Sequence, residues 1–338
     1  MPTLTGRQYA AGRKLARRLD LPPDQLFLVL EYGAAAFYGS YAQPKSGGGT
    51  RIIHVPHEPL VTIQQAILKR YFSCLPVSPI AHGCVAGRGI ESNAFPHRKA
   101  RSMVGFDLKD AYNQASFTRS FIQTYHHHYT TSNGEVIERW CSQRKQPWDI
   151  LPMELAVLEI VSDLVDIYSD YKEVLPHYKL VLPQGAPTSP ALFNFACQRM
   201  DARLEHLASN VGGVVTRFVD NIVFSWENDE VDRPVYSAIR RIIEKSGFKV
   251  NERKTVAIRN GNRNGVPLRF PGVHIIDGDL YIPRKKLRHL RMALHCAGKA
   301  HNDALYQGIK GYALQVEAQM PPQLRGVYGK ARADNPRI

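Results

Sequence analysis

The sequence contains few cysteines, and none of them lies in a zinc-binding or disulfide pattern. Five cysteines are spread far apart over 338 residues, and no C-x-x-C pair occurs. This spacing argues against a zinc ribbon and against a disulfide framework. Isolated thiols are typical of a reducing compartment, so we expect a cytoplasmic protein.

The sequence also lacks an apolar run long enough to span a membrane. The longest one, QLFLVLEYGAAAFYG at 25–39, is interrupted well before the roughly 20 residues that a bilayer requires. The N-terminus is basic but shows no apolar core followed by a cleavage site, so we expect no signal peptide. We therefore expect no membrane partner.

Acidic residues are scarce relative to basic ones. The chain has 44 Lys and Arg against 30 Asp and Glu, a net charge of +14 at pH 7. Between residues 251 and 338 the counts are 16 and 6, so +10 of this excess lies in the last quarter. A basic stripe favours a nucleic-acid backbone as partner over a merely basic, solvated surface.

The hydrophobic pattern predicts an α+β body followed by helices. Helical periodicity is clear near 4–19, 22–32, 58–74, 152–169, 190–208 and 232–246, and again after residue 283. Strand-like runs occur near 38–44, 51–55, 102–108, 178–182, 213–219, 222–226, 254–258 and 270–282. Mixed elements without regular alternation are typical of the α+β class. The segment 125–151 is loop-like and reads as an insertion.

Two carboxylates stand at the predicted ends of strands. In TRFVDNIVFSW (216–226), Asp220 and Asn221 separate two β-prone runs, which alone predicts an ordinary hairpin. In MVGFDLKDAY (103–112), a buried strand is predicted to end at Asp107. Two carboxylates from neighbouring strand ends can hold two Mg²⁺ ions about 3.5–4 Å apart, the arrangement that catalyses phosphoryl transfer.

A third segment, KLVLPQGAPTSPALFNF (179–195), predicts a strand, a tight turn and a helix. Ser189 is suited to the helix N-cap and Pro190 to the first helical position. Gly185 lets the backbone approach a bulky ligand closely. A tight turn explains the proline and the glycine, but it does not explain Gln184.

Four motifs follow one another in a fixed order: FDLKDAY (106–112), LPQGAPTSP (182–190), RFVDN (217–221) and GFKVNERKT (247–255). In this order they resemble palm motifs A to D of reverse transcriptases. Upstream, YAQPKSGGGTRIIHVPHEP (41–59) and NAFPH (93–97) are similar to the fingers of bacterial retron-type reverse transcriptases. The resemblance extends from about 38 to 273, with a thumb-like tail behind it.

This resemblance implies a right-hand polymerase of the α+β class with fingers, palm and helical thumb. The N-terminal helices and fingers would occupy 1–100 and the palm 101–282. The palm would contain a fingers insertion at about 113–178 and a primer-grip-like hairpin at about 268–282. The helical thumb would occupy 283–338.

The resemblance also implies roles for residues near the reacting groups. Asp107 and Asp220 would be the metal ligands, and the backbone carbonyl of Leu108 would be a further ligand. Lys254 would protonate the leaving pyrophosphate. Asn221 occupies the second catalytic position of motif C, where the family usually has an aspartate. Some viral RNA polymerases work with a Gly-Asp-Asn version of this motif.

Further residues would bind the nucleotide. Lys45 and Arg51 resemble the finger residues that grip a triphosphate through charge-assisted hydrogen bonds. Tyr112 resembles the bulky gate that excludes a ribose 2′-OH. Gln184 and Gly185 would shape the pocket for the nascent base pair.

A last group of residues would bind nucleic acid. Asn93 and His97 belong to the element that is associated with retron enzymes, although His97 could equally satisfy backbone groups in the interior. The basic residues after Pro283 would contact the phosphates of the duplex or form only a solvated face. They are Arg284, Lys285, Lys286, Arg288 and Arg291.

The implied function is an RNA-directed DNA polymerase that uses dNTPs and Mg²⁺, with Mn²⁺ as a substitute. A retron-type enzyme copies a dedicated structured noncoding RNA, as template and primer, into DNA, and it often acts with a separate effector protein in antiphage defence. The sequence specifies no oligomeric state.

Two departures from the family pattern keep alternatives open. One is Asn221, and the other is Phe270-Pro271-Gly272, where retron enzymes tend to have Val-Thr-Gly. The alternatives are a non-retron, defence-associated reverse transcriptase and a catalytically silent RNA-binding scaffold with the same fold.

Overall fold

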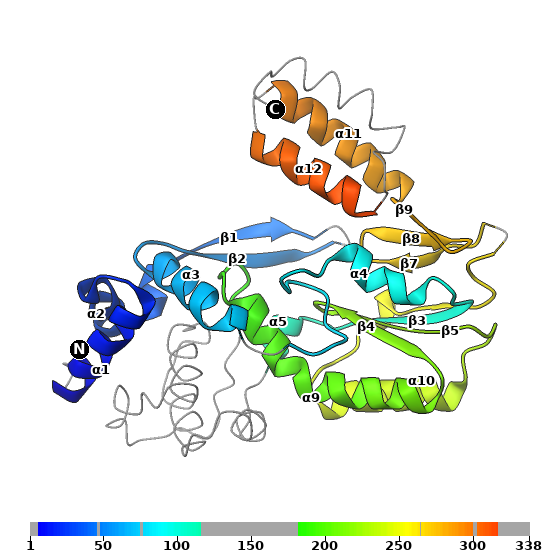
Figure 1. The fold of residues 1–338 in the computed structure, drawn as a ribbon, viewed down its shortest axis with the longest axis horizontal. Coiled ribbons are helices and arrows are strands. Elements are labelled where there is room, and N and C mark those ends of the chain that lie inside the picture. The colour runs from blue at the N-terminus through cyan, green and yellow to red at the C-terminus, as the bar shows by residue number, and fades with distance from the viewer. Residues whose placement is uncertain are drawn as a thin grey trace. The chain divides into compact units, whose positions relative to one another are not determined.

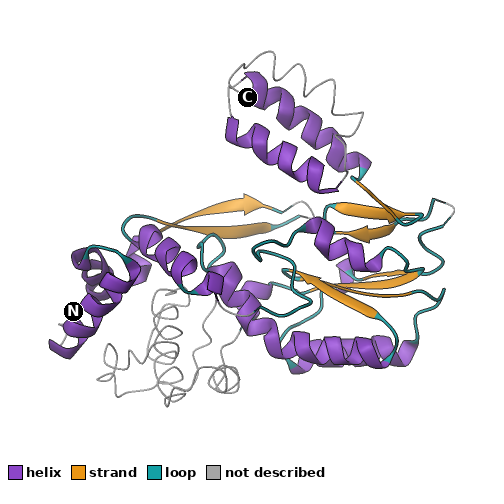
Figure 2. Cartoon of the chain, in the orientation of Figure 1, coloured by secondary structure: helices purple, strands orange, loops and turns teal. Residues whose placement is uncertain are grey.

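The computed structural model describes residues 6–45, 48–74, 77–115, 182–263, 265–299 and 303–316 (Figure 1). Within these ranges, helices and strands follow one another without regular alternation, which confirms the α+β class (Figure 2). The predicted helix at 152–169, the segment 125–151 and residues 178–181 of the strand predicted at 178–182 lie outside the described residues. In the described ranges, no helix has the length and apolar character needed to cross a bilayer.

The chain divides into two compact units, and each gathers segments that are distant in sequence. Unit 1 comprises Met1–Ser78, Asp110–Met200 and Lys245–Lys249. Unit 2 comprises Pro79–Lys109, Asp201–Glu244 and Val250–Ile338.

Unit 1 combines helices with one β-hairpin. Its described elements are α1 (Gly6–Leu19), α2 (Pro23–Tyr32), the 3₁₀ helix η1 (Ala34–Phe37), β1 (Tyr38–Pro44), β2 (Thr50–Pro56), α3 (Leu60–Arg70), η2 (Phe72–Cys74), α5 (Ala111–Gln114) and the first half of α9 (Ser189–Asn210). Helices α1, α2 and α3 pack against one another and bury Leu15, Leu26 and Ile63. These residues belong to apolar faces with helical spacing, and burial of such faces stabilises the helices.

The β1–β2 hairpin is closed by glycines. Gly48 and Gly49 have φ values of +89° and +79°, and the Lys45 N–H donates to the Gly49 carbonyl at 2.9 Å. A left-handed backbone favours glycine because a side chain would clash there. The glycine run after Lys45 therefore serves the turn.

Unit 2 is built on a four-stranded antiparallel sheet. Its strands are β3 (Ser102–Asp107), β4 (Val214–Phe218), β5 (Asn221–Trp226) and β6 (Val256–Ile258), in the order β4-β5-β3-β6. Strand β3 lies between β5 and β6 and is buried except at Gly105. Helix α10 (Arg233–Lys245) runs beneath this sheet in Figure 1, and its Tyr236 ring lies 5.2 Å from that of Phe106.

A second sheet and the C-terminal helices extend the core of unit 2. The second sheet comprises β7 (Leu268–Phe270), β8 (Val273–Ile276) and β9 (Asp279–Tyr281), and the helices are α11 (Arg284–Lys299) and α12 (Asp303–Val316). One continuous apolar cluster joins them to β3 and β5, and it includes Met103, Val223, Leu268, Val273, Ile275, Leu287, Leu290, Leu294 and Ile309. Positive φ angles at Gly272 and Gly278 reverse the chain twice, so the predicted hairpin is a three-stranded sheet.

The strands predicted at 102–108, 213–219 and 222–226 are confirmed as β3, β4 and β5. The strand predicted at 254–258 starts at Val256 because Glu252–Lys254 form the 3₁₀ turn η5. Helix α4 (Ile90–Ala94) and the 3₁₀ helix η3 (Phe95–His97) were not predicted. Such short helices contain too few turns for a periodic pattern.

His97 links η3 to two strands of the main sheet. Its Nδ1 lies 2.6 Å from Ser225 Oγ on β5, and its Nε2 lies 2.8 Å from Thr216 Oγ1 on β4. The side chain is fully buried. Burial, and secondarily the charge of His82, lowers the pKa of His97 to about 3. The ring is therefore neutral at pH 7 and acts as a hydrogen-bonded part of the core.

We expect His97 to make the protein sensitive to mild acid. Its folded pKa lies below the unfolded value of about 6.5, so the unfolded chain binds more protons, and stability falls as pH drops below 6.5 by at most about 1.4 kcal/mol per pH unit. Thermal melts of His97→Gln between pH 7 and pH 5 should show a shallower dependence than the wild type. Some dependence will remain from His82, whose pKa burial lowers to about 4.

The exposed His289 on α11 provides the matched control. His289→Gln replaces an exposed imidazole and controls for the loss of a histidine as such. An unchanged slope in His97→Gln would contradict the assignment of acid sensitivity to His97.

Candidate active site

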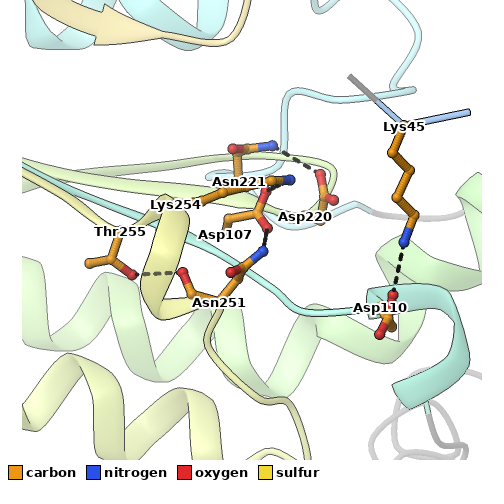
Figure 3. A network of polar contacts seen from close by, with 8 residues as sticks. All are labelled: Lys45, Asp107, Asp110, Asp220, Asn221, Asn251, Lys254 and Thr255. Carbon is orange, nitrogen blue, oxygen red and sulfur yellow. Dashed lines mark hydrogen bonds and ion pairs between the residues drawn. The ribbon is translucent and has the colours of Figure 1, made fainter. Parts of the chain in front are cut away.

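Two aspartates meet at adjacent strand ends in unit 2 (Figure 3). Asp107 is the last residue of β3, and Asp220 lies in the turn between β4 and β5. The β3–β5 register places Asp107 opposite Asn221, and the Leu108 N–H donates to the Asp220 carbonyl at 2.9 Å. Antiparallel pairing thus joins two carboxylates that are 113 positions apart in the sequence.

Asp107 is held by two side chains that follow helix α10. Lys254 Nζ lies 2.9 Å from Asp107 Oδ1, and Asn251 Nδ2 donates to Asp107 Oδ2 at 3.1 Å. The Asn251 N–H also donates to the Asp107 carbonyl at 2.8 Å. Asp107 is buried, whereas 63% of the Lys254 side chain is exposed. Asp107 is therefore fixed from the interior, and Lys254 approaches it from the solvent side.

Sequence reasoning missed Asn251 as a partner of Asp107. Asn251 lies in the motif GFKVNERKT, three residues before Lys254. Its own carbonyl accepts hydrogen bonds from the Thr255 hydroxyl at 3.2 Å and from the Lys254 N–H at 3.0 Å. The signal in the sequence is an Asn that starts a tight turn, but nothing local identifies its distant partner.

Burial and a neighbouring carboxylate disfavour the ionised form of Asp220. Burial, followed by the charge of Asp107, raises the pKa of Asp220 above its ordinary value. Lys254 and a hydrogen bond from Asn221 oppose this shift, and Asn221 Nδ2 donates to Asp220 Oδ1 at 2.9 Å. The two neighbouring carboxylates therefore attract a further cation.

The donor set fits a hard divalent cation. Asp107 and Asp220 offer carboxylate oxygens, and Mg²⁺ is usually bound by one or two carboxylates together with water and substrate phosphates. Among the residues that the structure describes, no three His, Cys, Asp or Glu side chains come together. The described site can thus provide two carboxylates and leave the other ligand positions to a substrate.

In unit 1, the predicted triphosphate residues lie on the β1–β2 hairpin. Lys45 Nζ lies 3.4 Å from Asp110 Oδ1, and both side chains are substantially exposed (Figure 3). Arg51 is exposed on β2. Both cations are accessible, and Lys45 has a carboxylate partner that an anionic ligand would have to replace.

Tyr112, Gln184 and Gly185 also belong to unit 1. The Tyr112 ring stacks on Phe193 at 5.1 Å, and the Tyr112 carbonyl accepts from the Leu182 N–H at 3.1 Å. The Gln184 carbonyl accepts from the His54 N–H at 2.7 Å.

Gly185 has no room for a side chain. Its φ is +122°, and a Cβ atom would collide with the His54 carbonyl of β2. The neighbouring Gln184 Oε1 is buried without a hydrogen-bond partner in the described part of the chain. The turn thus packs closely against β2, and Gln184 Oε1 remains available as a hydrogen-bond acceptor.

The predicted nucleic-acid residues fall into two groups. Asn93 and His97 are buried in unit 2, which does not support direct contact with RNA and favours the interior role considered for His97. The five basic residues on the first two turns of α11, from Arg284 to Arg291, are all exposed. The opposite side of α11 buries Leu287, Leu290 and Leu294. Helix α11 therefore presents a basic face to the solvent.

Comparison with known proteins identifies the family. Residues 43–275 match the model of the family described as reverse transcriptase (RNA-dependent DNA polymerase). The chain belongs to this family, which confirms the predicted right-hand polymerase fold with fingers, palm and thumb.

Several relatives of the chain are retron reverse transcriptases. The Retron Mx65 reverse transcriptase of Myxococcus xanthus is 32% identical over 283 residues, covering 81% of this chain and 61% of the relative. The Retron Mx162 enzyme of the same organism is 30% identical over 333 residues, with coverage of 93% and 65%. The Retron Ec86 enzyme of Escherichia coli is 24% identical over 295 residues, with coverage of 86% and 80%. The predicted resemblance to bacterial retron-type enzymes is confirmed, and the chain spans less than two thirds of both Myxococcus relatives.

We expect Asp220→Asn to stabilise the metal-free protein. Because the folded pKa of Asp220 is raised, ionising this carboxylate costs stability, and the cost grows as pH rises above the unfolded value. Removing the charge should stabilise the fold by roughly 1 kcal/mol, or raise the melting temperature by about 1–3 °C.

The same melts with and without Mg²⁺ test the cation site. Mg²⁺ should raise the melting temperature of the wild type, because a ligand that binds only the folded state stabilises it. Asp220→Asn should lose most of this response. Asp229→Asn serves as a control in the same unit, because Asp229 pairs with Arg101 at the opposite end of β3 from Asp107. An equal Mg²⁺ response in wild type and Asp220→Asn would contradict a cation site at these carboxylates.

Proposed function

We propose that this protein is an RNA-directed DNA polymerase of the retron type. The proposal rests above all on one observation: Asp107 and Asp220 lie side by side, with Lys254 on Asp107, in a chain of the reverse transcriptase family. The reaction is the attack of a primer hydroxyl on the α-phosphate of a dNTP, with loss of pyrophosphate.

The chemistry at the two carboxylates needs divalent cations. Asp107 and Asp220, with the Leu108 carbonyl, would hold Mg²⁺, or Mn²⁺ in its place, which supplies charge for the attacking and leaving oxygens. Lys254 Nζ lies 2.9 Å from Asp107 Oδ1 and is largely exposed, so it would be the proton donor to the leaving pyrophosphate.

The nucleotide would be selected by residues of unit 1. Lys45 and Arg51 offer exposed cations for the triphosphate, and Lys45 would exchange Asp110 for a phosphate oxygen. Tyr112, braced by Phe193, would exclude the ribose 2′-OH. Gln184 and Gly185 would border the base pair, with the buried Gln184 Oε1 as an acceptor.

The basic face of α11 would hold the template–product duplex. Its exposed lysines and arginines suit phosphate contacts, which provide affinity without reading sequence. Together with the resemblance in motif order, this supports our proposal that residues 283–338 form the helical thumb. The palm would be residues 101–282, with the insertion at about 113–178, and the N-terminal helices and fingers would be residues 1–100.

Similarity to retron reverse transcriptases supports the finer biological proposal. The template and primer would be a dedicated structured noncoding RNA, and the product would be DNA joined to it. We place the reaction in the cytoplasm, in antiphage defence with a separate effector protein. Sequencing the nucleic acid that copurifies with the protein tests this proposal, because a single folded RNA joined to DNA is expected.

The second candidate is a catalytically silent RNA-binding scaffold, and Asn221 is the observation that favours it. Loss of one motif C aspartate removes a negative charge from the site. Primer extension with dNTPs and Mg²⁺ separates the two candidates. If the protein incorporates no dNTP on any template, including the copurified RNA, the silent scaffold is the remaining candidate.

We expect Asp107→Ala and Asp220→Ala to abolish primer extension, with losses of at least about 10³-fold, because each removes a charged ligand from the cation site. RNA affinity should remain within about threefold, since the phosphate contacts lie elsewhere. Extension assays and RNA-binding titrations measure the two quantities. Asp279→Ala, at an exposed carboxylate on β9, is the control. Extension by either active-site variant would mean that the site is misplaced.

We expect Asn221→Asp to remain active and to shift the metal preference. The substitution removes the donor to Asp220 Oδ1 and adds a negative charge beside a buried carboxylate. More charge strengthens the attraction for divalent cations. Parallel Mg²⁺ and Mn²⁺ titrations of primer extension measure the shift. Complete inactivity at every metal concentration would show that the asparagine has a specific role of its own.

A further inference from the structure

A fully buried ion pair lies next to the turn that carries Asp220. Arg217 on β4 and Asp201 on α9 both have side chains with no exposed surface. Arg217 Nε donates to Asp201 Oδ1 at 2.8 Å, and Nη2 donates to Asp201 Oδ2 at 2.8 Å. This is the two-pronged geometry in which a guanidinium and a carboxylate interact most strongly.

The third nitrogen of Arg217 reaches the turn itself. Nη1 donates to the Val219 carbonyl at 2.9 Å. Val219 has a φ of +56°, in the left-handed region that a β-branched residue rarely occupies. Strained conformations of this kind persist only when the surroundings hold them. Val219 directly precedes Asp220, so its conformation sets the direction of the carboxylate.

The other side of the turn is closed by the chain around Gly83. The Arg217 N–H donates to the Ile80 carbonyl at 2.6 Å, and the His82 N–H donates to the Arg217 carbonyl at 2.8 Å. A Cβ atom at Gly83 would lie 2.5 Å from both the Val219 backbone nitrogen and its Cγ2. Only glycine leaves room for the turn as it stands.

We infer that Asp201, Arg217 and Gly83 are positioning residues that clamp Val219 and thereby aim Asp220 at Asp107. Stability alone does not account for the ion pair, because apolar residues of similar volume often replace a buried pair without loss. An apolar pair, however, has no donor for the Val219 carbonyl. The inference deepens the proposed function, on which it rests for the role of Asp220.

Two sets of variants separate positioning from folding. Asp201→Leu with Arg217→Met replaces the pair by apolar side chains and removes the donor to Val219. Gly83→Ala leaves the ion pair in place and displaces the turn from the other side. Gly308→Ala on α12 is the control, because a Cβ there meets nothing within 4 Å.

The first readout is amide hydrogen exchange in the metal-free protein. The Leu108 N–H, bonded to the Asp220 carbonyl, should exchange about tenfold faster or more in both sets of variants, because loosening the turn opens this bond. The Gly261 N–H donates to the carbonyl of Arg101, which precedes the first residue of β3, at the opposite end from Asp107. This amide should keep its wild-type exchange rate. Equal acceleration of both amides would indicate a general loss of stability and would overturn the positioning role.

The second readout is cation affinity, followed by the kinetics. Mn²⁺ binding, titrated by electron paramagnetic resonance, should weaken about 10–100-fold, as for other residues that support metal ligands. In primer extension, kcat should fall by a similar factor of about 10–100, with KM for dNTP within about threefold. Wild-type exchange at Leu108 together with wild-type Mn²⁺ affinity in Gly83→Ala would overturn the inference, even if the double variant failed to fold. Hydrogen exchange in the metal-free protein requires no polymerase activity. An inactive wild type would therefore refute the proposed function, whereas the exchange rates would still test the positioning role.

Discussion

The repulsion between Asp107 and Asp220 is the constraint on which the surrounding structure depends. Both carboxylates lie in a partly desolvated corner, and burial together with Asp107 raises the pKa of Asp220. Like charges at such a place cost free energy, because the medium screens them poorly. The β3–β5 register, Lys254 and Asn251 on one side, and Asn221 on the other hold the two groups in place. Two neighbouring carboxylates in a partly buried corner reduce stability, so stability does not explain why Asp107 and Asp220 lie together.

The hydrogen bond from Arg217 to the Val219 carbonyl and the backbone strain at Val219 have comparable energies. The turn therefore needs both Arg217 on one side and Gly83 on the other to keep its conformation. A left-handed, non-glycine residue such as Val219 costs about 1–3 kcal/mol. A hydrogen bond to a charged donor, such as Arg217 Nη1 to the Val219 carbonyl, contributes about 1.5–3 kcal/mol. One such bond just offsets the strain. Gly83 packs closely against Val219, and this contact sterically excludes other conformations of the turn.

The sequence predicted the parts of the site that depend on local pattern. Apolar, β-prone runs and turn residues identified β3, β4 and β5, and motif order placed Asp107 with Asp220 and Lys254. It could not predict Asn251 as a partner of Asp107 or Arg217 as a partner of Asp201, because such pairs exist only once distant segments pack. An arginine in TRFVDN looks like a surface residue of a strand, yet it is fully buried. His97 was ambiguous for the same reason, since its partners Thr216 and Ser225 lie about 120 residues away.

The asparagine at 221 then follows from the charge balance of this corner. A second aspartate would place three carboxylates around one buried turn, with Lys254 mostly exposed and bound to Asp107. The amide instead donates to Asp220 Oδ1 and lowers the cost of ionising it. Its carbonyl oxygen still offers an uncharged ligand to a hard cation. The residue that departs from the family pattern thus weakens the attraction for cations, but its hydrogen bond favours the ionised form of Asp220 and helps to hold this side chain in place.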